Sequence, residues 1–239
     1  MTPDSLTRPV ALITGASAGL GLALAHGLAE RGWALVINAR GAEALKNAAD
    51  ALAGQTDVVP LAGDITDPEH RADLVDAVGE LGRLDLLVNN ASYLGPSPLQ
   101  RLGAADLEEL RRVYEVDVIA PIALTQAFLP ELTAAAGIVL NISSDAAVEA
   151  YEGWGGYGSA KAALDHASAV LAAEHPELAV YAVDPGDLRT AMHQAAFPGE
   201  DISDRPQPAV VVPAFLRLLD SRPASGRYRA AEFAQAVAS

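Results

Sequence analysis

The sequence contains no cysteine, and this absence excludes disulfide bonds, thiolate metal ligands and a cysteine nucleophile. Basic residues are also scarce, with 16 Lys and Arg against 31 Asp and Glu, which gives a formal net charge of −15. Nucleic acids and anionic lipid surfaces carry the same sign, so non-specific binding to either is unfavourable. We therefore expect neither a nucleic acid nor a membrane as partner, and an anionic ligand would need a local basic or dipolar site.

A secretion signal and a long apolar helix are missing as well. Residues 1–9 are polar and contain two prolines, unlike a signal peptide. Residues 118–144 carry only one charge, Glu131, but Pro130 and Gly137 divide them into a helix and a strand, each too short to cross a bilayer. The five histidines show no spacing typical of metal ligands. We therefore expect a cytoplasmic protein without a bound metal.

What the sequence does contain is a regular alternation of short Val, Ile and Leu runs with longer Ala-rich segments of helical period. This alternation predicts an α/β fold with a doubly wound parallel sheet of about seven strands and helices on both faces. No linker, repeat or charge block divides the chain, so residues 1–239 are expected to form one domain with a substrate loop near residues 187–208. Strands are expected over residues 10–14, 34–38, 57–61, 84–89, 137–142 and 179–183, with a short last strand after Gly226. Helices are expected over residues 19–31, 42–52, 68–81, 104–134, 158–175 and 208–219.

A glycine-rich turn follows the first expected strand directly. Residues 14–21 read TGASAGLG and lead into an apolar helix. Glycines at such a junction allow a tight turn, close approach of backbone N–H groups to a pyrophosphate, and close packing of the helix on the strand. An ordinary strand-to-helix turn can be equally rich in glycine, so this motif alone leaves both interpretations open.

The TGxxxGxG spacing resembles the short-chain dehydrogenase/reductase family in its single-domain form. Further motifs follow in the family's order: Asp64, NNA at 89–91 with Ser92 in place of the family's glycine, Ser144, YGSAK at 157–161, DPG at 184–186, and Thr190. The resemblance extends to Met192 and implies a Rossmann-type fold, a nicotinamide dinucleotide cofactor and hydride transfer between a carbonyl and an alcohol. It places the cofactor contacts at Gly15, Ser17, Gly19, Leu20, Gly21, Arg40, Asp64, Asn90, Ala91, Tyr157, Lys161, Pro185, Gly186 and Thr190.

Tyr157 and Lys161 are the main catalytic candidates. They stand four residues apart at the start of an expected helix, so their side chains share one face. A nearby ammonium favours the phenolate, and Lys161 would therefore make Tyr157 a better proton donor and acceptor near neutral pH. The spacing alone is also typical of an ordinary half-exposed helix face. The resemblance implies in addition that Ser144, in preference to Ser143, orients the substrate oxygen and that Lys161 contacts the nicotinamide ribose.

Asp117 is a departure from the family, which usually has an asparagine there. The family's asparagine acts largely through its backbone carbonyl in a water-mediated proton relay to the lysine. We therefore expect Asp117 to preserve this relay as part of the catalytic centre. The alternative hypothesis is that a buried carboxylate pairs with Lys161, alters its charge balance and slows catalysis.

The end of the second strand bears on the choice of cofactor. Asn38-Ala39-Arg40 contains no carboxylate that would bind the ribose hydroxyls of NAD and repel a 2′-phosphate. Arg40 is suited to a phosphate, and Ser17 could add a hydroxyl donor. NADP(H) is therefore preferred. NAD(H) stays open because Arg40 could simply be solvated and Ala18 stands where NADP-preferring relatives often carry a basic residue.

The substrate is expected to be a small or medium, partly apolar carbonyl compound or alcohol. This expectation rests on candidate pocket walls at Tyr93, Leu94, Tyr151, Trp154, Met192 and Phe197. The charged run Glu108, Glu109, Arg111 and Arg112 is interpreted instead as a solvated helix face.

A homodimer or homotetramer is expected, because the Ala-rich helices over 104–134 and 158–175 permit close packing between copies. Residues 224–239 lack the family's frequent Asp-Gly-Gly ending, which argues against tetramer contacts through that segment. Two other functions fit less well. A catalytically weak NADP(H)-sensing regulatory protein on the same fold would not need Ser144, Tyr157 and Lys161, and a nucleotide-sugar epimerase would need a larger substrate domain after Pro185.

Overall fold

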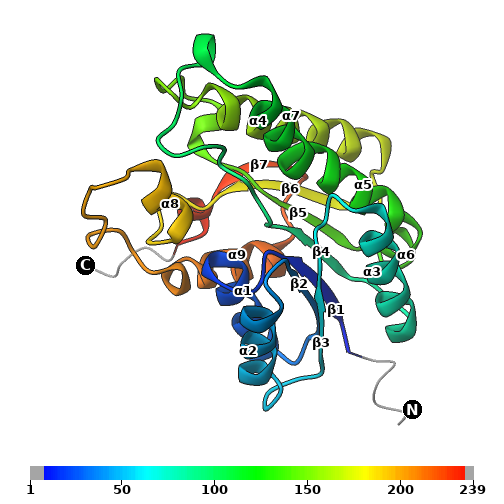
Figure 1. Cartoon of the computed structure of the whole chain (residues 1–239). Coiled ribbons are helices and arrows are strands. Elements are labelled where there is room, and N and C mark those ends of the chain that lie inside the picture. Colours follow the sequence, from blue (N-terminus) through cyan, green and yellow to red (C-terminus); the bar gives the residue numbers. More distant parts are fainter. Residues whose placement is uncertain (1–7, 235–239) are drawn as a thin grey trace, which may run out of the picture.

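The computed structural model describes residues 8–234, and its centre is a sheet of seven parallel strands in the order β3-β2-β1-β4-β5-β6-β7 (Figure 1). The strands are β1 (Val10–Thr14), β2 (Ala34–Ala39), β3 (Val58–Ala62), β4 (Leu86–Asn89), β5 (Ile138–Ile142), β6 (Ala179–Asp184) and β7 (Gly226–Arg229). The chain builds the sheet outward from β1 to β3 and then returns to place β4 on the other side of β1. Such a reversal opens a crevice at the carboxyl ends of the strands.

Helices cover both faces of the sheet, which confirms the expected Rossmann-type fold (Figure 1). One layer contains α1 (Gly19–Ala29), α2 (Ala42–Leu52) and α9 (Val212–Ser221). The other contains α3 (Pro68–Leu81), α4 (Leu107–Tyr114), α5 (Ala120–Ala127), α6 (Leu129–Ala134) and α7 (Gly155–Glu174).

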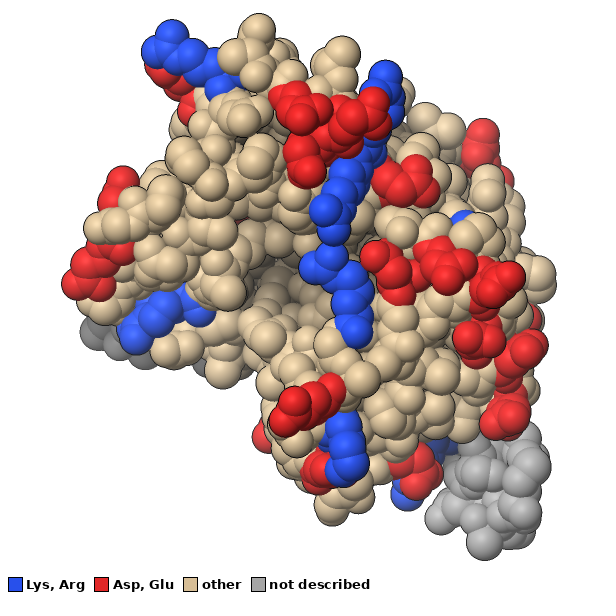
Figure 2. All heavy atoms as spheres, in the orientation of Figure 1, with Lys and Arg blue, Asp and Glu red and all other residues tan. Residues whose placement is uncertain are grey.

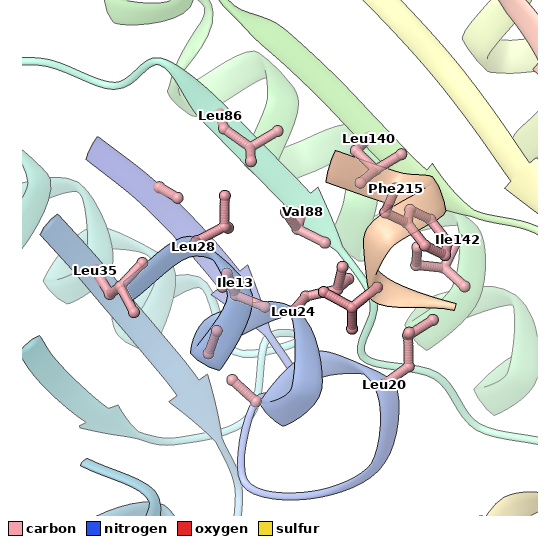
Figure 3. Packing of buried hydrophobic residues seen from close by; sticks show 14 of the residues in the cluster. Ile13, Leu20, Leu24, Leu28, Leu35, Leu86, Val88, Leu140, Ile142 and Phe215 are labelled. Carbon is pink, nitrogen blue, oxygen red and sulfur yellow. The ribbon is translucent and has the colours of Figure 1, made fainter. Parts of the chain in front are cut away.

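The core beneath the first layer fixes the position of α1 and therefore of the turn that precedes it. Figure 3 shows Leu20, Leu24 and Leu28 of α1, together with Phe215 of α9, packed against Ile13 and its neighbours on the sheet. All five residues of β1 are buried, as expected for a parallel strand covered on both faces. Each fully buried side chain of this kind contributes roughly 1.5–3 kcal/mol to the free energy of unfolding.

The prediction of a single helix over residues 104–134 is wrong, because the structure divides this segment into several helices. A π-helical turn, η3 (Glu115–Ile119), separates α4 from α5. Pro121 has no N–H to donate to the Asp117 carbonyl, as an α-helix would require, and a π turn accommodates this loss. Pro130 likewise has no N–H to donate to the Gln126 carbonyl, and the helix is interrupted at Phe128, between α5 and α6.

The segment 187–208 is not entirely a loop. It contains α8 (Ala191–Ala196), whose first turn is capped by the Thr190 hydroxyl accepting from the backbone N–H of His193 at 3.1 Å. The last helix begins at Val212 rather than at 208, after a short 3₁₀ turn, and α7 begins three residues earlier than expected.

The polar N-terminal segment 1–9 and the C-terminal segment 224–239 are described only in part. Residues 1–7 and 235–239 lie outside the described residues. Between residues 8 and 234, no helix has the length and apolar character needed to span a membrane.

Candidate active site

Two adjoining cavities lie at the carboxyl ends of the central strands. The larger has a volume of about 320 Å³, and the smaller, of about 260 Å³, shares Gly15, Ala91 and Ser92 with it. Figure 2 shows the hollow in this face, with a band of Lys and Arg side chains beside it. Every expected cofactor contact except Gly21 lines one of the two cavities. The larger cavity is lined by Gly19, Leu20, Asn90, Tyr157, Lys161, Pro185, Gly186 and Thr190. The smaller cavity is lined by Ser17, Arg40 and Asp64, and both cavities are lined by Gly15 and Ala91.

The glycine turn forms a cradle whose shape depends on missing side chains. A Cβ at Gly15 would lie 2.8 Å from Asn90 Nδ2, and one at Gly21 would lie 2.5 Å from the Gly15 carbonyl oxygen. Gly21 therefore serves packing. Asn90 Nδ2 donates to the Thr14 carbonyl oxygen at 2.8 Å, and the Thr14 hydroxyl accepts from the backbone N–H groups of Asn90 and Ala91, each at 3.0 Å.

The N-terminus of α1 faces this cradle without a side-chain cap among the described residues. Its first backbone N–H groups are thus available to an anion, and the helix dipole favours negative charge at this end. The cradle therefore fits the pyrophosphate of a dinucleotide.

Tyr157 and Lys161 are buried one turn apart on α7, as the spacing predicted. Lys161 Nζ lies 5.4 Å from the centre of the Tyr157 ring and donates to the Ile142 carbonyl oxygen at 3.0 Å. The same Nζ lies 3.0 Å from Asp117 Oδ1, and both side chains are almost fully buried, with 2% and 0% of their surface exposed. The carboxylate thus pairs with Lys161, which is the contact that the alternative hypothesis for Asp117 required.

The environment pushes the pKa values of this group in defined directions. Burial raises the pKa of Tyr157 above its ordinary value, and the Asp117 charge adds to this, while the Lys161 charge lowers it only in part. Burial acts against the Lys161 ammonium, but the charge and hydrogen bond of Asp117, with Tyr157, raise the pKa of Lys161 overall. Lys161 therefore acts on Tyr157 in the expected direction, yet burial and Asp117 outweigh it.

Ser144 follows β5 and borders the larger cavity. Its Oγ donates to Asp145 Oδ1 at 3.0 Å and accepts from the Ala146 backbone N–H at 3.2 Å. Ser143 also borders the cavity, but its hydroxyl is buried and has no hydrogen-bond partner within the described part of the chain.

Separate replacement of the two serines tests which of them acts. A Ser144→Ala variant is expected to lower kcat for carbonyl reduction by roughly a hundredfold to a thousandfold, because one donor to the developing oxyanion is lost. A Ser143→Ala variant, matched in chemistry and neighbouring in sequence, should keep kcat close to wild type because its hydroxyl makes no bond. Steady-state kinetics of both variants measure the difference, and the reverse pattern would assign the role to Ser143.

The smaller cavity contains the acidic and basic groups expected around the adenosine half of a cofactor. Asp64 accepts from the Thr66 backbone N–H and hydroxyl, both at 2.9 Å. Partial burial opposes its ionisation, but these hydrogen bonds and the charges of Arg40 and Arg112 hold the pKa of Asp64 below its ordinary value. Arg40 is exposed at the wall of this cavity, where a phosphate could reach it.

Tyr93 and the charged run on α4 differ from expectation. Tyr93 lines the smaller cavity rather than the larger, its hydroxyl donates to Glu109, and the Arg112 guanidinium lies 4.7 Å above its ring. Glu109 and Arg112 therefore contact a residue of the cavity wall, although Arg112 itself stays exposed. Arg111 pairs with Glu108 at the surface, as expected for a solvated helix face.

The remaining expected pocket walls are divided. Leu94, Trp154 and Met192 line the larger cavity, whereas Tyr151 and Phe197 do not. Phe197 instead supports the wall, with its ring 5.9 Å from that of Trp154. His193 also lines the cavity. Apolar side chains such as Leu94, Trp154 and Met192 thus share the cavity wall with polar ones that include Asp145 and His193.

Comparison with known proteins identifies the family. A family model described as short chain dehydrogenase matches residues 9–201. The chain belongs to the short-chain dehydrogenases. It is thus an oxidoreductase that acts on CH–OH and C=O groups.

Three relatives show how far the likeness extends. The sepiapterin reductase of Mus musculus is 35% identical over 210 residues, which cover 82% of this short-chain dehydrogenase and 80% of the relative. An alcohol dehydrogenase from the archaeon Thermococcus sibiricus, solved with 5-hydroxy-NADP, has a TM-score of 0.83 and 27% identity, covering 93% of this chain and 95% of that one. A protein of Escherichia coli CFT073, described as a short-chain dehydrogenase and solved with NADPH, has a TM-score of 0.84 and 30% identity, covering 95% and 98%.

Two further residues, Arg227 and Asp145, make contacts at Ser144 that arise only in the fold. Arg227 on β7 donates to the Ser144 carbonyl oxygen and to Asp165, each at 2.9 Å, and so fixes the backbone that carries Ser144. Asp145, which accepts from Ser144 and from the Tyr151 hydroxyl, also lines the cavity of this short-chain dehydrogenase. No sequence motif marks either residue.

Proposed function

We propose that this short-chain dehydrogenase is an NADP(H)-dependent carbonyl reductase for small or medium, partly apolar substrates, with Tyr157 as general acid and base. The observation that carries the proposal is the joint placement of Ser144, Tyr157 and Lys161 on one cavity that continues to the glycine cradle. When bound, the nicotinamide would supply or accept the hydride.

Each side chain has a defined part in the proposed reaction. Tyr157 donates its proton to the substrate oxygen during reduction, and Ser144 donates a hydrogen bond to the charge that develops there. Lys161 holds positive charge near the phenol. Because burial raises the pKa of Tyr157, the phenol stays protonated at neutral pH, so reduction should be lost and oxidation gained as the pH rises through that pKa.

The preference for NADP(H) rests on Arg40, on the absence of a carboxylate at the end of β2, and on relatives solved with NADPH or 5-hydroxy-NADP. An Arg40→Ser variant is expected to weaken NADPH binding by roughly tenfold to a hundredfold, because a charge-assisted hydrogen bond is worth about 1.5–3 kcal/mol. Binding of NADH should stay nearly unchanged, since NADH has no 2′-phosphate.

Titration of both cofactors by fluorescence measures these Kd values. Lys46→Ser on α2 is the matched control, because Lys46 pairs with Asp50 at the surface outside both cavities. Equal loss for NADPH and NADH in Arg40→Ser, or tighter binding of NADH than of NADPH by the wild type, would contradict the assignment.

The substrate is sought most directly among carbonyl compounds with an aromatic or apolar part. Sepiapterin is the first to test, because sepiapterin reductases match about four fifths of this chain. Consumption of NADPH against a panel of aldehydes, ketones and diketones tests the function. Tight binding of NADPH without turnover across the panel would instead support the NADP(H)-sensing protein.

For assembly and location, we propose a cytoplasmic homodimer or homotetramer that uses the layer of α4, α5 and α7. Leu107, Ile119 and Val170 are large apolar side chains exposed on this layer and its π turn. A second copy of the chain would remove them from water.

A further inference from the structure

The hydroxyl of Ser144, the proposed donor to the substrate oxygen, is already engaged in this structure. It has a single proton, which it donates to Asp145 Oδ1 at 3.0 Å. To donate to a substrate oxygen instead, the hydroxyl must give up this bond, and the carboxylate then loses a hydrogen-bond donor. A substrate that brings a donor of its own to Asp145 would replace the lost bond.

Asp145 borders the larger cavity and can accept further hydrogen bonds. Its Oδ1 accepts from Ser144 and from the Ala146 backbone N–H at 2.8 Å, and its Oδ2 accepts from the Tyr151 hydroxyl at 3.0 Å. An ionised carboxylate has about four acceptor positions, so these three bonds leave one position free. Release of the Ser144 hydroxyl opens a second position, on Oδ1.

We propose that Asp145 is a specificity-determining residue, which accepts a hydrogen bond from a hydroxyl or amino group on the carbon atom next to the reacting carbonyl. The inference rests on the proposed function and assigns its substrate class as α-hydroxy and α-amino carbonyl compounds. In the complex, Ser144 donates to the carbonyl oxygen while Asp145 accepts from the neighbouring O–H or N–H. The substrate thus makes two hydrogen bonds side by side.

The spacing of the two protein groups suits such a substrate. Ser144 Oγ and Asp145 Oδ1 are 3.0 Å apart, and two oxygens on adjacent carbon atoms have a similar separation. One protein group donates and the other accepts, which complements a carbonyl oxygen beside a hydroxyl. A second oxygen that can only accept, as in a diketone or an α-keto acid, would instead place its lone pairs against the carboxylate.

The charges of the cavity wall favour the same class. Asp145, Asp184 and Asp187 line the cavity, whereas Lys161 is the only Lys or Arg among the lining residues of the described chain and is paired with Asp117. An amino group is attracted by this wall when protonated, and an anionic substrate is repelled.

A second polar group of the wall also lacks a partner. His193 has 10% of its side chain exposed, and its buried Nε2 has no hydrogen-bond partner between residues 8 and 234. Because a buried polar group without a hydrogen bond is unfavourable, this cavity suits a substrate that carries polar groups in addition to its apolar part.

A matched series of aryl ketones tests the assignment in the complete enzyme with NADPH. Acetophenone and its α-hydroxy, α-amino and α-methoxy derivatives differ only at the carbon next to the carbonyl. The methoxy compound withdraws electrons as the hydroxy compound does, but its oxygen has no proton to donate. We expect kcat/KM of the wild type to be roughly tenfold to a hundredfold higher for the hydroxy and amino compounds than for the methoxy compound.

Variants of Asp145 link this preference to the carboxylate. Asp145→Ala removes the acceptor and should bring the ratio of kcat/KM for the hydroxy and methoxy compounds close to one. Asp145→Asn keeps an oxygen that can accept but loses the charge, so the preference for the amino compound should fall further than that for the hydroxy compound. A purely structural role in the turn after β5 would instead lower kcat/KM for every ketone alike.

Asp187→Asn is the matched control. Asp187 is a second carboxylate of the same cavity wall, but it lies beside Arg205, with its Oδ2 3.5 Å from Arg205 Nε. This variant should leave the ratio of the hydroxy to the methoxy compound unchanged. A ratio that falls equally in Asp187→Asn and Asp145→Ala would show that the general charge of the wall, and not a bond to Asp145, sets the preference.

Two further results would overturn the assignment and leave the proposed function intact. One is a wild-type enzyme that reduces the hydroxy and methoxy compounds equally well, a comparison that needs no variant to fold. The other is an Asp145→Ala enzyme that keeps the wild-type ratio. An enzyme that binds NADPH but reduces none of the carbonyl compounds would overturn the proposed function, and the assignment with it.

Discussion

A Tyr157→Phe enzyme is expected to lose carbonyl reduction by about a hundredfold to ten-thousandfold in kcat, the range that a general acid contributes. The change removes only the hydroxyl and keeps the ring that packs at the cavity. Its edge contact with Trp154, at a centroid distance of 5.9 Å, should persist. NADPH binding should therefore change little, and single-turnover kinetics with titration of NADPH would separate the two effects.

Tyr181→Phe is a suitable control for this loss. Tyr181 is also buried, and its hydroxyl donates to the Pro223 carbonyl oxygen at 2.9 Å, away from both cavities. This variant should lose about 1 kcal/mol of stability with little change in kcat. Retention of wild-type turnover by Tyr157→Phe would remove Tyr157 from the mechanism.

The second large effect is expected from Gly158, which lies beside Tyr157 on α7. A Cβ at this position would lie 2.5 Å from the Ala146 carbonyl oxygen, in the backbone turn that follows Ser144. A Gly158→Ala variant must therefore push α7 away from that turn. We expect a loss of about 1–3 kcal/mol in the free energy of unfolding. We also expect kcat/KM to fall by up to about a hundredfold, because the distance between Tyr157 and Ser144 increases.

Gly156→Ala provides the matched control on the same helix. A Cβ at Gly156 would lie 3.5 Å from Leu110 Cδ1, an ordinary van der Waals contact. Thermal unfolding and steady-state kinetics of both variants test the argument. Equal stability and activity of the two would show that close packing at Gly158 does not set the geometry of the site.

The sequence could predict features that depend on local pattern. The buried strands, the glycine turn and the i, i+4 placement of Tyr157 and Lys161 each follow from a short stretch of residues, and the fold agrees with the prediction. Parallel strands then bring their carboxyl ends together, which explains why the expected cofactor contacts converge on two adjoining cavities.

Features that depend on contacts between distant segments could not be predicted. Ser92 and Asp117 are 25 residues apart, and only the packing of η3 against the loop after β4 shows that they touch. The π turn itself arises from the position of Pro121 within a segment of otherwise helical period. Tyr93 was expected beside the substrate, but it lines the smaller cavity. The type of a side chain and its place near a site do not indicate which of two adjoining cavities it faces.

The contact between Arg227 and the Ser144 carbonyl has a consequence for biosynthesis. Ser144 lies more than 80 residues before Arg227, and β7 is the last of the seven strands in chain order. During synthesis the glycine turn and the helix with Tyr157 leave the ribosome before α9 and β7, and a domain folds as a unit. The backbone at Ser144 is anchored by Arg227 only when β7 pairs with β6, and α1 is covered by Phe215 only when α9 is present, so both the catalytic centre and the dinucleotide cradle are completed by the last elements of the chain to be made.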